Sequence, residues 1–254
     1  MSSSPSQSQP NAGPIKAVIF DYMGTCLDWH GAVTLGLPDT IPAYQRSPLA
    51  LAWRQQYFRE SERRVSKGSP VEDVDTTLKR ALDHVLHQDT HFRTLAIHFD
   101  ARSAEEAIQS WHRQRAWAEV PAALKALRGL GCEVYMHANG STRLQIDNTR
   151  AAGLNDGTFD LLMSSQLLGE YLPNPRAYER ALELIKLRPE QVVKVAAHAY
   201  DIRGAKKAGM KTVYVKRWTD DIDVDKEEAG KEFDAVLDDM SRLPEVIARL
   251  QGCE

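Results

Sequence analysis

The sequence predicts a three-layer α/β fold, in which a mostly parallel sheet lies between helices and a helical segment is inserted into the chain. Two observations support this prediction. After Pro121, short apolar strands alternate with helices, a pattern typical of right-handed βαβ units. The long stretch before Pro121 is helical in pattern, and no strand of comparable signal interrupts it. We therefore expect an α/β core made of residues 15–31 and 118–254, and a helical cap made of residues 32–117.

The first strand is expected at residues 15–20, where a short apolar run rich in β-branched residues indicates a buried strand. The tail before it, residues 1–14, is rich in Ser, Pro and Gln and is expected to be disordered. In the cap, the first amphipathic helix is expected to start at Ser47 as its N-cap, with Pro48 at the first helical position. The three expected cap helices span residues 47–67, 71–88 and 103–117.

After the cap, strands and helices follow one another, and glycine or proline marks several of the boundaries. The expected strands span residues 132–138, 159–165, 192–197, 211–217 and 233–239. The expected helices span residues 122–131, 142–153, 175–187, 201–209 and 243–251. Strands joined by helices in this way pair in parallel, so their carboxyl ends meet at one edge of the sheet.

Ligands of open α/β sheets bind beyond the carboxyl ends of the strands, so the residues at those ends are the candidates for a functional site. Asp21 follows the first strand directly. Residues 137–141 follow the second strand, and Tyr171-Leu172 lies downstream of the third. Residues 198–201 follow the fourth strand and end in Asp201. A carboxylate at two of these ends indicates a site rather than packing alone.

Four of these segments occur in the order and spacing of a known set of motifs. They are DYMGT from Asp21 to Thr25, Ala138-Asn139-Gly140, Leu172-Pro173-Asn174-Pro175, and Asp201 with the downstream GAKKAGMKT. In these motifs the chain resembles the haloacid dehalogenase superfamily, specifically its L-2-haloacid dehalogenase-like branch. The resemblance covers nearly all of residues 15–245. It implies a Rossmann-like core with a cap, and a hydrolase acting on a small organic substrate.

The resemblance also implies that Asp21 is a nucleophile, whose carboxylate forms an ester that water then hydrolyses. Phosphatases of the superfamily carry a second aspartate two residues later, as the general acid for the leaving oxygen. Met23 stands at that position here. A halide leaving group needs no proton, so Met23 favours the dehalogenase branch over a typical phosphatase.

The chain departs from the family in its second and third motifs. Leu172 stands where the family has a lysine that orients the nucleophile and offsets its charge, and Ala138 lacks the motif's hydroxyl. Without that lysine, repulsion and burial should raise the pKa of at least one of Asp21 and Asp201. Alternatively, a divalent cation such as Mg²⁺ binds both carboxylates. No other cofactor is expected.

Three functions stay open on the sequence alone. The first is a haloacid dehalogenase-like hydrolase. The second is an isomerase, lyase or cyclase on the same scaffold, with Asp21, His198 and Asp201 as acids and bases. The third is a catalytically silent protein that only binds a ligand. Because function depends on the site and not on the fold, the fold does not choose among them.

The candidate catalytic residues are Asp21, Asp201 and His198. The candidate substrate-binding residues are Met23, Thr25, Arg54, Tyr57, Asn139, Leu172 and Tyr178. Arg54 and Tyr57 lie one turn apart on an expected cap helix, so both can face the substrate. Tyr178 lies six residues after Leu172, where the family also has a tyrosine.

The composition bounds the partners. Among 254 residues, 32 are basic and 35 acidic, for a net charge of −3, and basic residues form no long run. This balance argues against nucleic acid or an anionic membrane as the partner, and favours a small-molecule substrate. The three cysteines form no CxxC pair, which favours reduced thiols in a cytoplasmic protein. A homodimer stays open.

Overall fold

The computed structural model describes residues 14–155 and 157–252, so most of the expected tail, residues 1–13, lies outside the described residues. Six strands form one parallel sheet in the order β5-β4-β1-β6-β7-β8. The strands are β1 (Ala17–Phe20), β4 (Glu133–Ala138), β5 (Leu161–Ser164), β6 (Val192–Ala196), β7 (Lys211–Val215) and β8 (Ala235–Leu237). The predicted α/β fold is confirmed.

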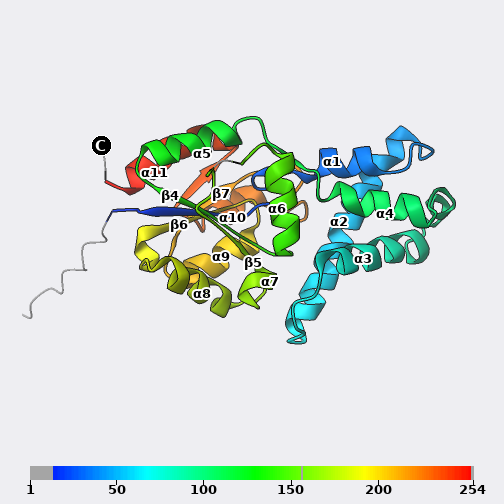
Figure 1. Ribbon diagram of the computed structural model, residues 1–254, viewed down its shortest axis with the longest axis horizontal. Coiled ribbons are helices and arrows are strands. Elements are labelled where there is room, and N and C mark those ends of the chain that lie inside the picture. Colours follow the sequence, from blue (N-terminus) through cyan, green and yellow to red (C-terminus); the bar gives the residue numbers. More distant parts are fainter. Residues whose placement is uncertain (1–13, 156, 253–254) are drawn as a thin grey trace, which may run out of the picture.

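Helices cover both faces of this sheet (Figure 1). Helices α5 (Val120–Gly129) and α11 (Leu243–Leu250) pack on one face, and α8 (Pro175–Ile185) and α9 (Ala199–Lys207) on the other. The remaining core helices are α6 (Thr142–Ala151), α7 (Ser165–Leu168), α10 (Lys226–Gly230) and the 3₁₀ helices η2 (Pro189–Gln191) and η3 (Met240–Arg242).

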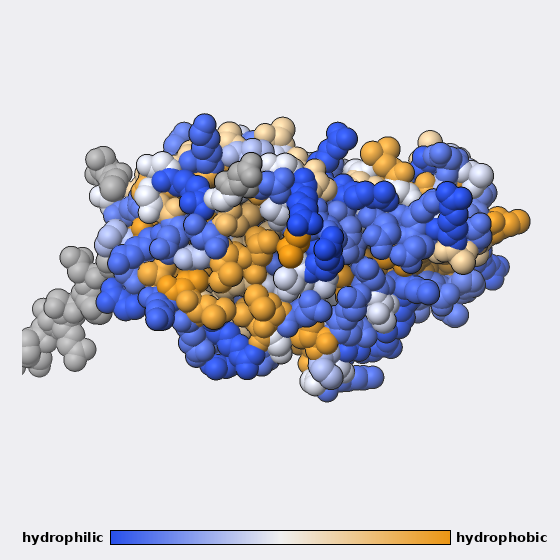
Figure 2. Space-filling model, in the orientation of Figure 1, coloured by the Kyte–Doolittle hydropathy of each residue, from blue (hydrophilic) through white to orange (hydrophobic). Residues whose placement is uncertain are grey.

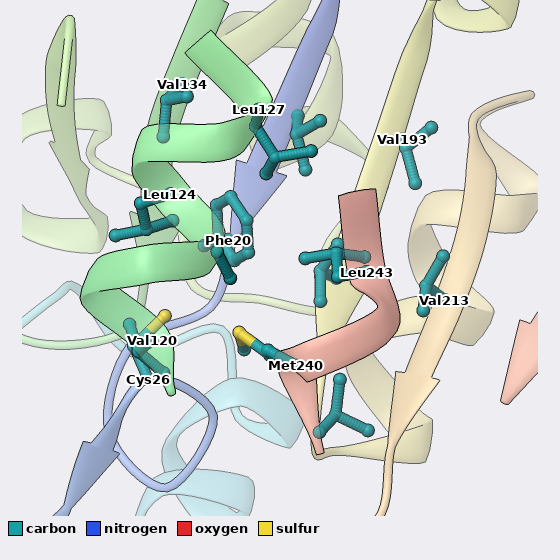
Figure 3. Packing of buried hydrophobic residues seen from close by; sticks show 14 of the residues in the cluster. Phe20, Cys26, Val120, Leu124, Leu127, Val134, Val193, Val213, Met240 and Leu243 are labelled. Atoms are coloured by element: carbon teal, nitrogen blue, oxygen red, sulfur yellow. The ribbon is translucent and has the colours of Figure 1, made fainter. Parts of the chain in front are cut away.

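One side of strand β1 is buried in the apolar core under α5 and α11, which stabilises it as a strand (Figure 3). There, Phe20 lies among Leu124, Leu127 and Leu243. Successive side chains of a strand point to opposite faces, so Ile19, and Asp21 after it, belong to the face that α8 and α9 cover. The central place of β1 thus puts Asp21 in the middle of the sheet's carboxyl edge.

The inserted segment is helical and has an apolar core of its own. Its elements are α1 (Trp29–Gly36), α2 (Ala43–Ser66), α3 (Val74–Gln88), η1 (Arg93–His98) and α4 (Ala101–Ser110). Trp29, Trp53 and Trp111 are fully buried in this second core, and the rings of Trp29 and Trp111 stack with centroids 5.5 Å apart. Two short strands, β2 (Leu27–Asp28) and β3 (Arg115–Ala116), pair where the chain leaves and re-enters the α/β core.

Helix α2 starts earlier than the sequence predicts. It begins at Ala43 after Pro42, and Pro48 lies inside it, so the expected Ser47 N-cap is wrong. Pro48 lacks the N–H that would bond to the carbonyl of Tyr44. This loss falls at the exposed start of the helix, since Tyr44 is 78% exposed, and the helix passes through it.

The surface of the core carries apolar side chains beside the edge strand β5. Leu161, Leu167 and Leu184 are exposed there, on β5, α7 and α8. Figure 2 shows an apolar area on this side of the core, whereas the cap surface in the same view is mostly hydrophilic. None of the helices in residues 14–155 and 157–252 combines the length and apolar character needed to cross a membrane.

Candidate active site

Asp21 is held by one of its two carboxylate oxygens. Its backbone N–H continues the sheet by donating to the carbonyl of Val195 at 3.0 Å. Its Oδ2 accepts hydrogen bonds from Thr25 Oγ1 at 2.5 Å and from His198 Nδ1 at 2.9 Å. Thr25 is fixed in turn, because its Oγ1 accepts from the N–H of Ala197 at 2.8 Å. Within the described part of the chain Oδ1 has no hydrogen-bond partner, and the Asp21 side chain lines a cavity.

His198 lies between two buried carboxylates. Its Nε2 contacts Asp220 Oδ1 at 2.9 Å, opposite the contact of Nδ1 with Asp21. Burial alone would lower the pKa of His198, but the charges of Asp21 and Asp220 outweigh it and raise the pKa to about 10. His198 is therefore an imidazolium at neutral pH and donates both hydrogen bonds. The same pairing holds the pKa of Asp21 below its ordinary value, although burial alone would raise it.

Asp220 is a site residue that sequence reasoning missed. It is fully buried beyond the end of β7, where its Oδ2 accepts from Trp29 Nε1 at 3.1 Å and from Thr219 Oγ1 at 2.7 Å. Its Oδ1 lies 3.5 Å from Arg54 Nη2 of the cap. Burial alone would raise the pKa of Asp220, but His198 and Arg54 lower it. The rule that sites lie at strand ends, applied to the fifth predicted strand as well, would have found it.

Lys194 is the second residue that was missed. Its side chain is fully buried in β6, and its Nζ lies 3.1 Å from Asp201 Oδ2 and 2.7 Å from the carbonyl of His137. Asp201 Oδ1 accepts from the hydroxyl of Tyr178 at 2.8 Å. The pKa of Asp201 is raised because burial outweighs the attraction of Lys194, as expected for one member of the Asp21 and Asp201 pair. The sequence signal that could have identified Lys194 is a single charge in the apolar run VVKVAA.

Leu172 lies in the apolar cluster beneath α8 and also lines the cavity. Asn139 fixes its backbone from the end of β4: Asn139 Nδ2 donates to the Leu172 carbonyl at 3.0 Å, and the Leu172 N–H donates to Asn139 Oδ1 at 2.9 Å. The next peptide bond, Leu172-Pro173, is cis. Asn139 therefore positions the third motif.

The cavity has a volume of about 540 Å³ and is lined by both the core and the cap. The core contributes Asp21, Met23, Asn139, Leu172 and His198, and the cap contributes Arg54, Tyr57 and Phe58. Thr25, Asp201 and Tyr178, which were expected at the site, do not line this cavity. Thr25 bonds to Asp21, whereas Tyr178 bonds to Asp201.

Arg54 brings a buried guanidinium to the cavity. Its centre lies 4.4 Å from the ring of Phe58 and 5.7 Å from the ring of Tyr57. The Nη2 atom reaches the Met23 carbonyl at 3.4 Å. Over residues 14–155 and 157–252, Nε and Nη1 find no hydrogen-bond partner although both are buried. Buried donors without partners are rare, so this guanidinium can accept an anionic ligand.

The carboxylates do not fit a divalent cation. Mg²⁺ prefers oxygen ligands with free lone pairs. Here Lys194 and Tyr178 already contact the two oxygens of Asp201, and Thr25 and His198 already bond to one oxygen of Asp21. No cluster of three or more His, Cys, Asp or Glu side chains suited to a metal ion occurs in the part of the chain that the structure describes.

An α/β core with an aspartate at the end of its central strand, facing a cavity under a helical cap, defines a class of hydrolase. A family model for haloacid dehalogenase-like hydrolases matches residues 15–209, so the chain belongs to this family. The family assignment made from the four motifs is confirmed.

Sequence relatives and solved structures agree with this family assignment. The chain is 28% identical to "(S)-2-haloacid dehalogenase 1" of Pseudomonas sp. (strain CBS-3), over 93% of this chain and 98% of that one. It is 28% identical to "Haloacetate dehalogenase H-2" of Moraxella sp. (strain B), over 80% and 87% of the two chains. The crystal structure of the L-2-haloacid dehalogenase PA0810 superposes with a TM-score of 0.75 at 27% identity, covering 91% of this chain and 98% of that one. Relatives named as phosphatases also match.

Proposed function

We propose that this hydrolase removes the halogen from a short 2-haloacid, with Asp21 as the nucleophile. The observation that carries the proposal is the asymmetry of the Asp21 carboxylate. Thr25 and His198 hold Oδ2, whereas Oδ1 has no hydrogen-bond partner in the described residues, and the side chain lines the cavity. An ionised carboxylate with one oxygen fixed and the other free is arranged for displacement at a carbon atom.

The proposed reaction has two steps. In the first, Oδ1 of Asp21 forms a bond to C2 of the substrate as the carbon–halogen bond breaks, and the halide leaves with the bonding electrons. In the second, a water oxygen bonds to the side-chain carbonyl carbon of Asp21, and the ester bond from that carbon breaks. The products are a 2-hydroxyacid, a halide and a proton, and Asp21 is regenerated with a solvent oxygen.

The surroundings of Asp21 support a leaving group that needs no proton. Met23 lines the cavity at the position where phosphatases of the family place their general acid. His198 bonds to Asp21 and Asp220 through both ring nitrogens, so its protons are already engaged. A general acid contributes about 10²–10⁴-fold to such reactions, and its absence disfavours alkoxide leaving groups. Phosphate monoesters should therefore be poor substrates.

Arg54 is the proposed binding group for the negative charge of the substrate or of the departing halide. Its Nε and Nη1 are buried beside the ring of Phe58 and have no hydrogen-bond partner among the residues that the structure describes, so an anion that reaches them would gain strong charge-assisted hydrogen bonds. Tyr57 and Phe58 supply apolar walls beside it. A small carboxylic acid with an apolar halogen matches this combination.

The experiment is a single turnover in ¹⁸O-water with the protein in excess over (S)-2-chloropropionate. If Asp21 is the nucleophile, the label enters the peptide that contains Asp21, and mass spectrometry detects it there. If Asp21 acts as an acid or base, no ¹⁸O enters the peptide, and a parallel turnover in deuterium oxide puts deuterium into the product. Turnover with no label at Asp21 would overturn the proposal. A silent binding protein would give no product at all.

A location in the cytoplasm and a homodimer stay predictions from the sequence, as do the domain boundaries at residues 31–32 and 117–118. Cell fractionation tests the location, light scattering tests the homodimer through its mass in solution, and limited proteolysis tests the domain boundaries.

A further inference from the structure

A lysine buried completely inside a central strand is unusual. Lys194 lies in β6 between Val193 and Val195, and its side chain is not exposed at all. Removing an ammonium group from water is unfavourable unless a carboxylate and hydrogen bonds replace the lost hydration. Apolar residues fill the other positions of β6, so packing does not require a charge here.

The direction of the Lys194 side chain follows from the sheet. Lys194 lies opposite Ile19 in the register of β6 with β1. Both belong to the face that α8 and α9 cover, and alternation puts Asp21, two residues after Ile19, on that face too. The ammonium therefore lies beneath the carboxylates at the sheet's edge, 3.1 Å from Asp201 and bonded to the carbonyl at His137.

Several polar, charged or titratable groups lie around Asp21 on the elements packed against it. They are Cys26 and Thr25 in the following turn, His137 on β4, Lys194 on β6, Tyr178 on α8, His198, Tyr200 and Asp201 at the start of α9, Arg54 and Tyr57 on α2, and Asp220 after β7. Only three of these are cations when His198 is protonated: His198, Arg54 and Lys194. His198 is shared with Asp220, and Arg54 also faces Asp220.

We propose that Lys194 is a positioning residue. From inside β6 it supplies the positive charge that keeps Asp21 ionised and holds Asp201 in place, a charge that Leu172 cannot supply. As a statement about catalysis this rests on the proposed function, in which Asp21 must be ionised to act as the nucleophile. The attraction of Lys194 is among the causes that lower the pKa of Asp21. Lys194 thus stabilises the reactive form without touching the substrate.

The test is the titration of Asp21 in protein labelled with ¹³C at the carboxyl carbons of aspartate, with the Asp21 signal assigned through its loss in Asp21→Asn. We expect Lys194→Met to raise the midpoint of Asp21 by about one pH unit, as the loss of a nearby opposite charge does. Lys216→Met is the matched control. It removes one surface positive charge, and its midpoint should equal that of the wild type.

Lys194→Met leaves Asp201 buried without its cation and can fail to fold. The comparison of Asp201→Asn with Asp201→Asn/Lys194→Met removes the unpaired carboxylate at position 201, and in the single variant Lys194 keeps its hydrogen bond to the His137 carbonyl and the attraction of Asp21. Lys194 is the only difference between the two, so the Asp21 midpoint should be higher in the double variant. Equal midpoints would overturn the proposal.

Relocating the charge separates positioning from general stability. Leu172 lines the cavity that Asp21 faces, so Leu172→Lys can return a cation from the opposite side. We expect Leu172→Lys/Lys194→Met to bring the Asp21 midpoint, and the acid limb of kcat/KM, back toward the wild type. A midpoint that stays at the Lys194→Met value would contradict charge supply. The titration needs no substrate, so failure of the haloacid assay alone would count against the proposed function and not against Lys194.

Discussion

At the scale of single residues, Thr25 forms two hydrogen bonds from its position after β1. Its hydroxyl donates to Asp21 and accepts from the N–H of Ala197, so it joins the first and fourth motifs. Its side chain is fully buried, so water cannot replace the hydroxyl in these two hydrogen bonds.

Thr25→Val should therefore reduce both stability and activity. The valine fills the same space but leaves the N–H of Ala197 buried without an acceptor, which costs about 1–3 kcal/mol. Urea denaturation measures this loss. Thr158→Val is the control, because the Thr158 hydroxyl bonds only to a carbonyl at an exposed site. Equal unfolding midpoints for the two variants would contradict this account of Thr25.

His198 should make stability depend on pH in the alkaline range. Its pKa in the folded protein is about 10, above the ordinary value of about 6.5. Its contribution is therefore complete below pH ~6.5 and is lost as the pH rises through ~10, at a rate on the order of 1 kcal/mol per pH unit. Urea unfolding of the wild type and of His198→Gln between pH 6 and 10 measures the difference. A difference that grows with pH would contradict an imidazolium at this site.

At the scale of elements, His112 joins the cap to the core just after α4. Its Nε2 contacts Asp75 of α3 at 2.9 Å, and its Nδ1 contacts Asp147 of α6 at 3.0 Å. Burial alone would lower the pKa of His112, but the two carboxylates raise it. The bridge is thus strongest below the ordinary pKa of histidine and weakens as the pH rises through the raised value.

His112→Asn should loosen the segment that connects the cap to the core. We expect faster amide hydrogen exchange at residues 112–117 and a loss of about 1 kcal/mol of stability. His91→Asn provides the comparison, since His91 forms a similar pair with Asp89 but is exposed. If both variants exchange alike at residues 112–117, His112 does not act as a bridge.

The elements also show what sequence can and cannot predict. The first and fourth motifs were predictable because Asp21, His198 and Asp201 follow strongly apolar strands. Asp220 could be found only as a residue beyond the end of a predicted strand, and its contact with His198 could not be predicted, because only folding brings the two together. Strands β2 and β3 have two residues each and are too short for any alternation to appear. In the sequence Lys194 is visible as a single charge in an apolar strand, but its pairing with Asp201 depends on how α9 packs.

At the scale of the whole molecule, Arg54 is one of the contacts through which the cap reaches the charges of the core. Its Nη2 lies near Asp220 and near the carbonyl of Met23. Its Nε and Nη1 are buried and have no hydrogen-bond partner in the described part of the chain. The proposed binding of an anion by Arg54 would therefore involve a residue that also joins the cap to the core.

Arg54→Met should lower kcat/KM for a 2-haloacid by about 10- to 100-fold, because a charge-assisted hydrogen bond of about 1.5–3 kcal/mol is lost. Steady-state kinetics measure this loss. Arg59→Met is the control, because Arg59 lies on the same helix but is exposed. An Arg54→Met enzyme as active as Arg59→Met would exclude Arg54 from substrate binding.

The free Oδ1 of Asp21 has a stereochemical consequence. As the nucleophile it attacks the substrate carbon from the side opposite the halogen, and this displacement inverts the stereocentre. The later attack of water occurs at the carbonyl carbon of Asp21 and leaves the stereocentre unchanged. A chiral 2-haloacid should thus give the hydroxyacid of inverted configuration. Chiral chromatography of the product from a single enantiomer measures this, and a racemic product would mean that the halogen is not lost in one displacement by Asp21.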